Sequence, residues 1–238
     1  MTDEQAVHDE PHGEVTAGRL NWLRAGVLGA NDGIVSVSAI MVGIAAATPT
    51  FTPLLAGGLA ALVGGAISMA LGEYVSVSSQ RDSQRALIAQ ERRELATTPE
   101  DELAELADLY RAKGLSVETA RRVAEELTAH DALAAHLEAE LGIDEEDIAN
   151  PWAAAFSSAV AFLSGGVLPL VVALLVPQAA RIVAIVVVVL VALAVTGVLG
   201  ARLGGSPVAR AAVRVLVGGA LALVATIVVG GLLGTAGI

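Results

Sequence analysis

The chain has 238 residues, of which 55% are hydrophobic and only 16% are charged, and its mean hydropathy is +0.68. Because a typical soluble domain carries about 25% charged residues, this composition excludes an ordinary soluble domain and predicts an all-α integral membrane protein. The net charge of −11 argues against nucleic-acid binding, and the absence of cysteine excludes disulfides, thiolate metal sites and cysteine catalysis.

The acidic residues are distributed unevenly along the chain. The first 18 residues contain five acids and lack the basic segment of a signal peptide, so residues 1–18 are predicted to be a disordered acidic N-terminal tail. Residues 82–150 contain 18 acidic and 7 basic side chains, whereas residues 151–238 contain no Asp or Glu. This pattern predicts a compact acidic module, suited to a cationic ligand, on a membrane body that is nearly free of acids.

Five apolar stretches are long enough to cross a bilayer core, which takes about 20 helical residues. Two lie within residues 19–79 and three within residues 151–238, so the acidic residues 80–150 form an insert between the second and third membrane helices. The five predicted stretches are Trp22–Ala47, Leu54–Val77, Trp152–Val176, Ile182–Ala201 and Val215–Gly234.

Arginines near the ends of these stretches indicate how the chain is oriented in the membrane. With five crossings, only Arg181 falls on one side, and the other side holds Arg19, Arg24, Arg81, Arg85, Arg202, Arg210 and Arg214. The N-terminus and the insert are therefore expected in the cytoplasm and the C-terminus outside. Nothing in the sequence addresses an organelle, so a plasma (inner) membrane location is expected.

Small residues follow one another at helical spacing along the second predicted membrane helix. They are Gly57, Gly58, Ala61, Gly64, Gly65, Ser68 and Gly72. Such a stripe lets two helices approach closely within lipid, either inside one subunit or at the contact between two copies in a homodimer.

Helix start and stop signals divide the insert into segments. The second membrane helix is predicted to continue without a break through residues 80–95. Thr98 before Pro99 predicts a helix start, and Gly114 ends that helix. Ser116 is expected to cap the next helix, and Asp131 is expected to begin a last one that ends at Gly142.

Two carboxylic acids, Asp32 and Glu73, lie within the predicted membrane helices. Asp32 is ten residues past Trp22, roughly 15 Å along a helix and near the middle of the bilayer. A carboxyl there is costly unless it faces a cavity or a partner, and Asn31 and Gly33 beside it suggest a polar, irregular backbone. Met69 lies one turn before Glu73, so Asp32, Met69 and Glu73 are candidates for one metal path. The alternative is that Asp32 pairs with Arg24 or a helix end and that Met69 is a core residue.

Pairs of glutamates recur at a spacing of three in the insert. Glu91 and Glu94 form one pair and Glu102 and Glu105 the other, and the turn between them would let the two helices fold back on each other. His136 and Glu140, four residues apart, would add an imidazole and a fifth carboxylate, as in carboxylate-bridged metal bundles. The alternative is that these glutamates form a solvated helix face.

Two sequence strings resemble those of the vacuolar iron transporter (VIT) family, as found in a bacterial-type member. The first is Ala-Asn-Asp-Gly at residues 30–33, and the second is Ser-Met-Ala-Leu-Gly-Glu-Tyr-Val-Ser-Val at residues 68–77. The resemblance covers nearly the whole chain and implies a homodimer of five-helix subunits that exchanges cytosolic Fe²⁺ for protons. It also implies a cytoplasmic insert that binds metal before delivery to the membrane path.

The resemblance assigns roles to particular residues of this chain. The membrane aspartate of the family falls on Asp32, and its path methionine and the nearby glutamate fall on Met69 and Glu73. The glutamates of the insert fall on Glu91, Glu94, Glu102, Glu105 and Glu140. One turn before Glu140 the family can have methionine, where this chain has His136, and imidazole also suits Fe²⁺, Mn²⁺ or Zn²⁺.

The expected function is therefore that of a proton-coupled exporter of Fe²⁺ or Mn²⁺, with the ion as substrate and no prosthetic group. The expected partners are divalent metal ions, protons, the lipid bilayer and a second copy of the chain. The alternative is a membrane-anchored metal sensor or buffer without transport. An intramembrane enzyme is not expected, because the membrane helices contain a single aspartate and no histidine.

Overall fold

The computed structural model describes residues 17–145 and 148–236, with side chains from residue 25 onward, and most of the predicted acidic tail lies outside the described residues. The described part of the chain is helical and contains no strand. The α-helices are α1 (Ala17–Ala47), α2 (Phe51–Thr97), α3 (Pro99–Ala112), α4 (Val117–His136), α5 (Pro151–Leu175), α6 (Gln178–Leu203) and α7 (Val208–Ala236). A short π-helix, η1 (Leu137–Leu141), follows α4 directly.

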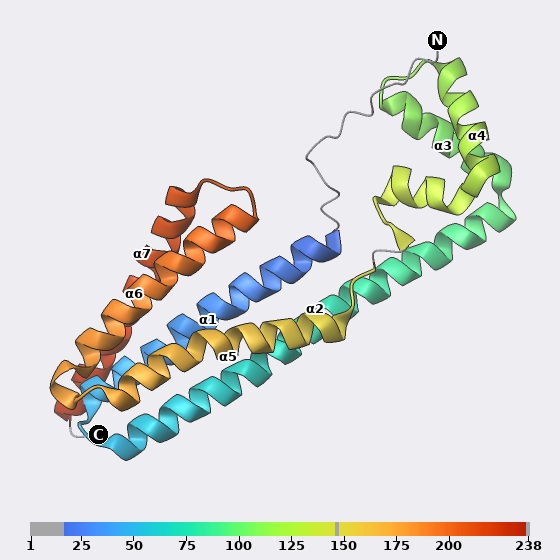
Figure 1. Ribbon diagram of the computed structural model, residues 1–238. Coiled ribbons are helices and arrows are strands. Elements are labelled where there is room, and N and C mark those ends of the chain that lie inside the picture. Colours follow the sequence, from blue (N-terminus) through green and yellow to red (C-terminus); the bar gives the residue numbers. More distant parts are fainter. Residues whose placement is uncertain (1–16, 146–147, 237–238) are drawn as a thin grey trace, which may run out of the picture.

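Five of the described helices, α1, α2, α5, α6 and α7, are long and apolar enough to cross a membrane, which confirms the predicted number of spans. Helix α1 lies at the centre of the bundle, where it packs against α5, α7, α2 and α6 (Figure 1). The core between these helices contains Val37, Met41, Phe162 and Leu193. The outer faces of α2, α6 and α7 expose valines and leucines, as expected of helices that face lipid.

Helix α2 continues from the bundle into the insert without a break, as predicted (Figure 1). Its 47 residues correspond to about 70 Å, more than twice the thickness of a bilayer core. The rings of Tyr74 and Trp152 lie 4.6 Å apart, and aromatic pairs of this kind are typical of the membrane interface. The part of α2 beyond this level, including Glu91, therefore lies outside the membrane-spanning segment.

The insert follows the predicted segments, with differences at two helix ends. Ser116 accepts a hydrogen bond from the Thr119 amide, and Asp131 breaks the helix and accepts one from the Ala134 amide at 3.0 Å. Thr98 precedes α3 as expected, but its hydroxyl donates to the Glu94 carbonyl and does not cap α3. The last segment ends at Gly142 in the left-handed region, but its final turn is π-helical where an α-helix was expected.

The glycines of the membrane helices serve close packing. Helix α1 passes through Gly33 without interruption, so the expectation of an irregular backbone there is wrong. A Cβ at Gly33 would overlap the carbonyl oxygen of Phe162 on α5, and one at Gly29 would lie 2.7 Å from the Ser158 carbonyl oxygen. In the stripe on α2, Gly58 and Gly65 contact α1 and α5, whereas Gly64 and Gly72 have no neighbour within 4 Å of a Cβ. Gly57 also contacts α1, so three of the five glycines in the stripe are used inside the subunit and two remain open.

We expect Gly33→Ala to destabilise the bundle by about 1–3 kcal/mol, because a buried methyl group would push α1 away from the α5 backbone. Thermal unfolding of the purified protein in detergent measures this effect. Gly218→Ala on α7 is the matched control, because it adds the same methyl group to a membrane helix at a position with no neighbour within 4 Å of a Cβ. Equal unfolding temperatures for the two variants would contradict the packing role of Gly33.

Candidate metal centre and membrane carboxylates

Three potential metal ligands from three helices meet inside the insert: Glu91 of α2, Glu102 of α3 and His136 at the end of α4. His136 Nδ1 lies 3.0 Å from Glu91 Oε1 and 3.7 Å from Glu102 Oε2, and one ligand atom of each residue lies within 4.8 Å of the others. The exposed fractions are 3% for Glu91, 7% for Glu102 and 0% for His136. Two carboxylates and an imidazole at this separation have the right chemistry to bind a transition-metal cation.

The turn between α2 and α3 brings the two glutamates together. The Thr98 amide donates to the Glu94 carbonyl, which ends α2, and Pro99 then begins α3. Leu106 of α3 packs against Ala124 and Ala135 of α4, and this small core holds the end of α4 against α3. His136 follows Ala135 and is thereby directed between Glu91 and Glu102.

Burial and mutual repulsion shift the pKa values of the clustered side chains. Burial, followed by repulsion from Glu140, Glu102, Glu94 and Glu105, raises the pKa of Glu91 to about 7. Burial also raises the pKa of Glu102, and burial lowers the pKa of His136. The imidazole is therefore neutral near pH 7, so its close approach to Glu91 is not a salt bridge. Neither ring nitrogen of His136 has a hydrogen-bond partner among the described residues.

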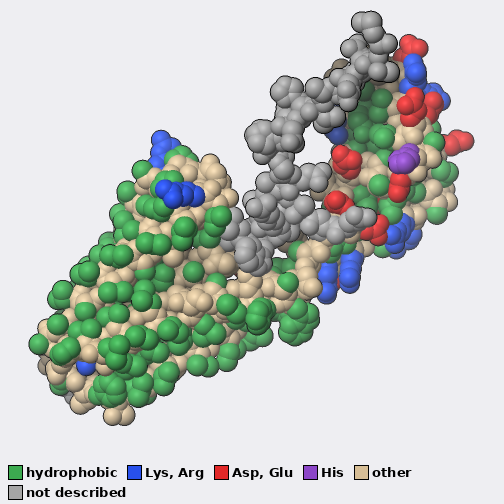
Figure 2. Space-filling model, in the orientation of Figure 1, with side chains coloured by type: hydrophobic (Ala, Val, Ile, Leu, Met, Phe, Trp, Pro, Cys, Tyr) green, Lys and Arg blue, Asp and Glu red, His purple; other side chains and the backbone are tan. Residues whose placement is uncertain are grey.

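The other three predicted ligands lie around this cluster but are less buried. Glu94 is half-buried and accepts a hydrogen bond from Gln90 at 3.1 Å, whereas Glu105 and Glu140 are exposed. Burial, followed by repulsion from Glu105 and Glu94, raises the pKa of Glu140. Figure 2 shows acidic side chains on the surface of the insert, away from the mostly apolar bundle. The six predicted residues thus form a buried triad with an acidic surround.

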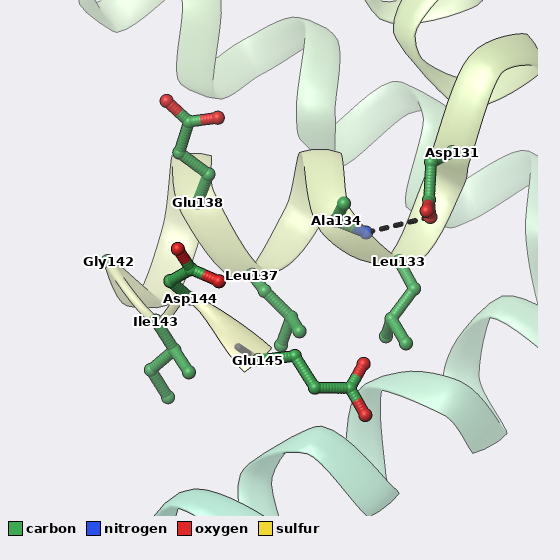
Figure 3. A pocket seen from close by; sticks show the side chains of 9 residues that line it. All are labelled: Asp131, Leu133, Ala134, Leu137, Glu138, Gly142, Ile143, Asp144 and Glu145. Atoms are coloured by element: carbon green, nitrogen blue, oxygen red, sulfur yellow. Dashed lines mark hydrogen bonds between the residues drawn. The ribbon is translucent and has the colours of Figure 1, made fainter. Parts of the chain in front are cut away.

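A cavity of about 540 Å³ lies next to this cluster, between Asp131 and Glu145 (Figure 3). Two of the acidic side chains that line this cavity already have partners in the protein. Asp131 caps the Ala134 amide, and Glu145 forms an ion pair of 2.5 Å with Arg92 of α2. None of the three clustered ligands lines this cavity, so it is not the metal centre.

Asp32 lies half-buried on α1, within the membrane bundle. One of its carboxylate oxygens accepts a hydrogen bond of 2.7 Å from the Ser36 hydroxyl one turn later. Among the described side chains Asp32 forms no ion pair, and the Arg24 side chain proposed as its alternative partner lies outside them. On α2, Glu73 is buried and Met69 is half-buried against the bundle core. The three predicted path residues thus lie in the membrane bundle, with Asp32 on α1 and Met69 and Glu73 on α2.

Two polar residues of the bundle were not predicted. The Thr196 hydroxyl donates to the Asn31 amide oxygen at 2.6 Å and so ties α6 to the turn of α1 that carries Asp32. Ser158 of α5 is fully buried, and its hydroxyl has no partner among the described residues. The signal for Thr196 was present in the sequence, because it has the only polar side chain within residues 182–201.

Comparison with known proteins supports the resemblance seen in the sequence. The profile of the VIT family matches residues 23–231. A vacuolar iron transporter of Acanthamoeba castellanii is 46% identical over 94% of this chain and 83% of its own length. Vacuolar iron transporter homolog 1 of Oryza sativa subsp. japonica is 41% identical, over 87% of this chain and 72% of its own length.

A further relative, vacuolar iron transporter homolog 2 of Arabidopsis thaliana, is 37% identical over 87% of this chain and 82% of its own length. These names describe transporters and not enzymes, in agreement with the expectation from the sequence. The match extends over all five candidate membrane spans and the insert between them. The chain is therefore an integral membrane protein that belongs to the VIT family.

Proposed function

We propose that this protein moves a divalent transition-metal cation, Fe²⁺ or Mn²⁺, out of the cytoplasm in exchange for protons. The observation that carries the proposal is the buried triad of Glu91, Glu102 and His136. Its member Glu91 lies on the same continuous helix, α2, that bears Met69 and Glu73 in the bundle. The names of the relatives, which refer to iron transport, support the choice of substrate.

In this proposal the insert captures the ion. The surrounding carboxylates attract a cation, and the triad binds it with two oxygens and one nitrogen. This mixture favours Fe²⁺, Mn²⁺ or Zn²⁺ over Ca²⁺ and Mg²⁺, which prefer oxygen ligands alone. Helix α2 then links the capture site directly to the membrane bundle.

The membrane step depends on Asp32. Glu73 and Met69 receive the ion from the insert before it reaches Asp32. A carboxylate among apolar helices needs a cation or a proton to neutralise it. Among the side chains that the structure describes, from residue 25 onward, Asp32 accepts a hydrogen bond from the Ser36 hydroxyl, which is neutral. Binding a metal ion there releases a proton, and the opposite exchange on the far side completes the cycle. The metal ion and the proton differ in their affinity for the inward-open and outward-open states. This difference shifts the protein between the two states.

The orientation and assembly belong to the same proposal. The insert faces the cytoplasm of a cell whose plasma (inner) membrane holds the protein, because the arginines at the helix ends gather on the insert side. Two copies form a homodimer, and the two open glycines of the α2 stripe, Gly64 and Gly72, give them a surface for close contact. The names of the relatives refer instead to the vacuole, so fractionation of the cell is a direct test of location.

Flux measurements in liposomes test the proposal. Purified protein is reconstituted, and uptake of Fe²⁺, Mn²⁺, Zn²⁺ and Ca²⁺ is followed with and without a pH gradient. We expect uptake of Fe²⁺ and Mn²⁺ that an acidic lumen accelerates and that raises the lumenal pH, because protons leave as the metal ion enters. Uptake of Ca²⁺ alone would contradict the argument from His136 and Met69. Metal binding without any flux would favour the sensor or buffer.

Replacing Glu91, Glu94, Glu102 and Glu105 together with Gln is expected to weaken transport several-fold at low metal concentration and much less at saturation. The reason is that capture limits the rate only when the ion is scarce. The control is Glu118→Gln with Glu126→Gln, which removes exposed acids of the same insert away from the triad. A concentration dependence equal to that of the control would contradict the capture role.

A further inference from the structure

A second cavity, an open groove, lies in the membrane bundle between α1, α6 and α7. Its volume is about 470 Å³, within the range of small-molecule sites. Helix α6 ends and α7 begins at this cavity, on the side of the bundle where α1 and α5 also approach the insert (Figure 1). Its lining includes Val27, Leu28, Asn31, Thr196, Ser206 and Arg214.

The groove is open because α6 presents glycines there. A Cβ at Gly197 would lie 3.0 Å from Ala212 Cα, and one at Gly200 would lie 3.2 Å from Val27 Cγ1. Helix α6 therefore packs closely against α7 and α1 here, and the residues that it contributes to the lining are small: Thr196, Gly197, Gly200 and Ala201. The hydrogen-bonded pair Asn31 and Thr196 also lines the groove.

The charge around the mouth of the groove is positive. Arg214 lines it and is exposed, and Arg202 and Arg210 lie at the adjoining ends of α6 and α7. Residues 151–238 contain no acid that would neutralise them. The amide groups of the first turn of α7 add the positive end of a helix dipole. Figure 2 shows basic side chains gathered at this end of the bundle.

We propose that this groove binds an anionic glycerophospholipid of the leaflet on the insert side. The phosphate lies against Arg214, and Ser206 supplies a hydroxyl donor beside it. The upper part of an acyl chain lies against Val27 and Leu28 of α1 and Val215 of α7, where half-exposed apolar side chains line the groove. Basic pockets between membrane helices have this combination of a charged mouth and an apolar wall.

Because of the position of the groove, a lipid bound there would affect transport. Asn31 lines the groove and precedes Asp32 directly on α1, so the bound lipid supports the turn that carries Asp32. The site itself rests on the groove and its arginines and stands independently of the proposed transport activity.

Native mass spectrometry of the purified protein tests selectivity. The protein is exchanged into detergent with phosphatidylglycerol, with phosphatidylcholine, or with glycerol 3-phosphate alone. We expect one retained phosphatidylglycerol per chain, several-fold less phosphatidylcholine, and no retained glycerol 3-phosphate, because the apolar wall contributes to binding. Arg214→Gln should reduce retention of phosphatidylglycerol several-fold, whereas Arg85→Gln, an equal charge change on α2, should not. Equal retention of both lipids, or equal effects of both variants, would overturn the proposal.

A second measurement locates the lipid. The chain has no cysteine, so Leu28→Cys carries a single fluorophore at an exposed position of the groove. Phosphatidylglycerol with brominated acyl chains should quench it more strongly than brominated phosphatidylcholine at the same mole fraction. Equal quenching by the two lipids, or a fluorophore shielded from both by a second copy of the chain, would overturn the proposal.

Discussion

Asp32→Asn is expected to reduce metal flux to the background of empty liposomes while the protein keeps its fold. The amide has nearly the same shape and still accepts the hydrogen bond that Ser36 donates to Asp32 at 2.7 Å. It carries no negative charge, so it neither binds a divalent cation strongly nor exchanges a proton at accessible pH. The measurement is Fe²⁺ or Mn²⁺ uptake by proteoliposomes, together with the thermal unfolding temperature of the same preparation.

The matched control for this variant is Asp82→Asn on the insert side of α2. Asp82 is an exposed acid that contacts Arg81 at 3.4 Å, so its replacement removes the same charge outside the bundle. Ser36→Ala separates orientation from charge, because it leaves the carboxylate in place without its hydroxyl partner, and we expect it to slow uptake only partly. Normal exchange by Asp32→Asn would show that the membrane carboxylate has no part in transport.

The sequence predicted the architecture well because each membrane helix is a long apolar run, and the bilayer thickness sets its length. The ends of the membrane helices were predicted less well. Helix α7 begins at Val208, seven residues before the predicted Val215, because Arg210 and Arg214 lie on exposed turns that continue the helix beyond the apolar stretch. Hydropathy locates the membrane core and does not detect a helix that continues into water.

The candidate site could be predicted in its residue types but not in its burial. Helical spacing places Glu91 with Glu94 and Glu102 with Glu105, but it does not show that only the first of each pair turns inward. That outcome depends on the packing of Leu106 against α4, a contact between distant parts of the chain. The pairing of Asn31 with Thr196 joins residues 165 positions apart and was missed for the same reason.

Metal binding by the insert is expected to strengthen as pH rises toward about 7 and then to level off. The pKa of Glu91 is raised to about 7, mainly by burial, so below this pH a proton occupies the ligand that the metal needs. Each pH unit below 7 should therefore weaken binding by up to about tenfold per proton displaced. Titration calorimetry with Mn²⁺ on the full chain, from pH 5.5 to pH 8, measures this dependence.

The same raised pKa makes a prediction about stability without metal. Between the ordinary glutamate pKa of 4.5 and about 7 the folded chain binds more protons than the unfolded one, so metal-free stability should fall as pH rises across this window. Mn²⁺ should then raise the unfolding temperature more at pH 8 than at pH 5.

Glu91→Gln and His136→Gln are each expected to weaken Mn²⁺ binding by roughly 10- to 100-fold, and Glu91→Gln should also flatten the pH dependence, because the titrating ligand is gone. Glu118→Gln, at an exposed position of α4, is the control and should retain both the affinity and the slope. His136→Gln should weaken binding but leave a pH dependence, since Glu91, the ligand with the raised pKa, is still present. A pH slope that survives in Glu91→Gln would assign the titration to another carboxylate and would contradict the central place of Glu91 in the triad.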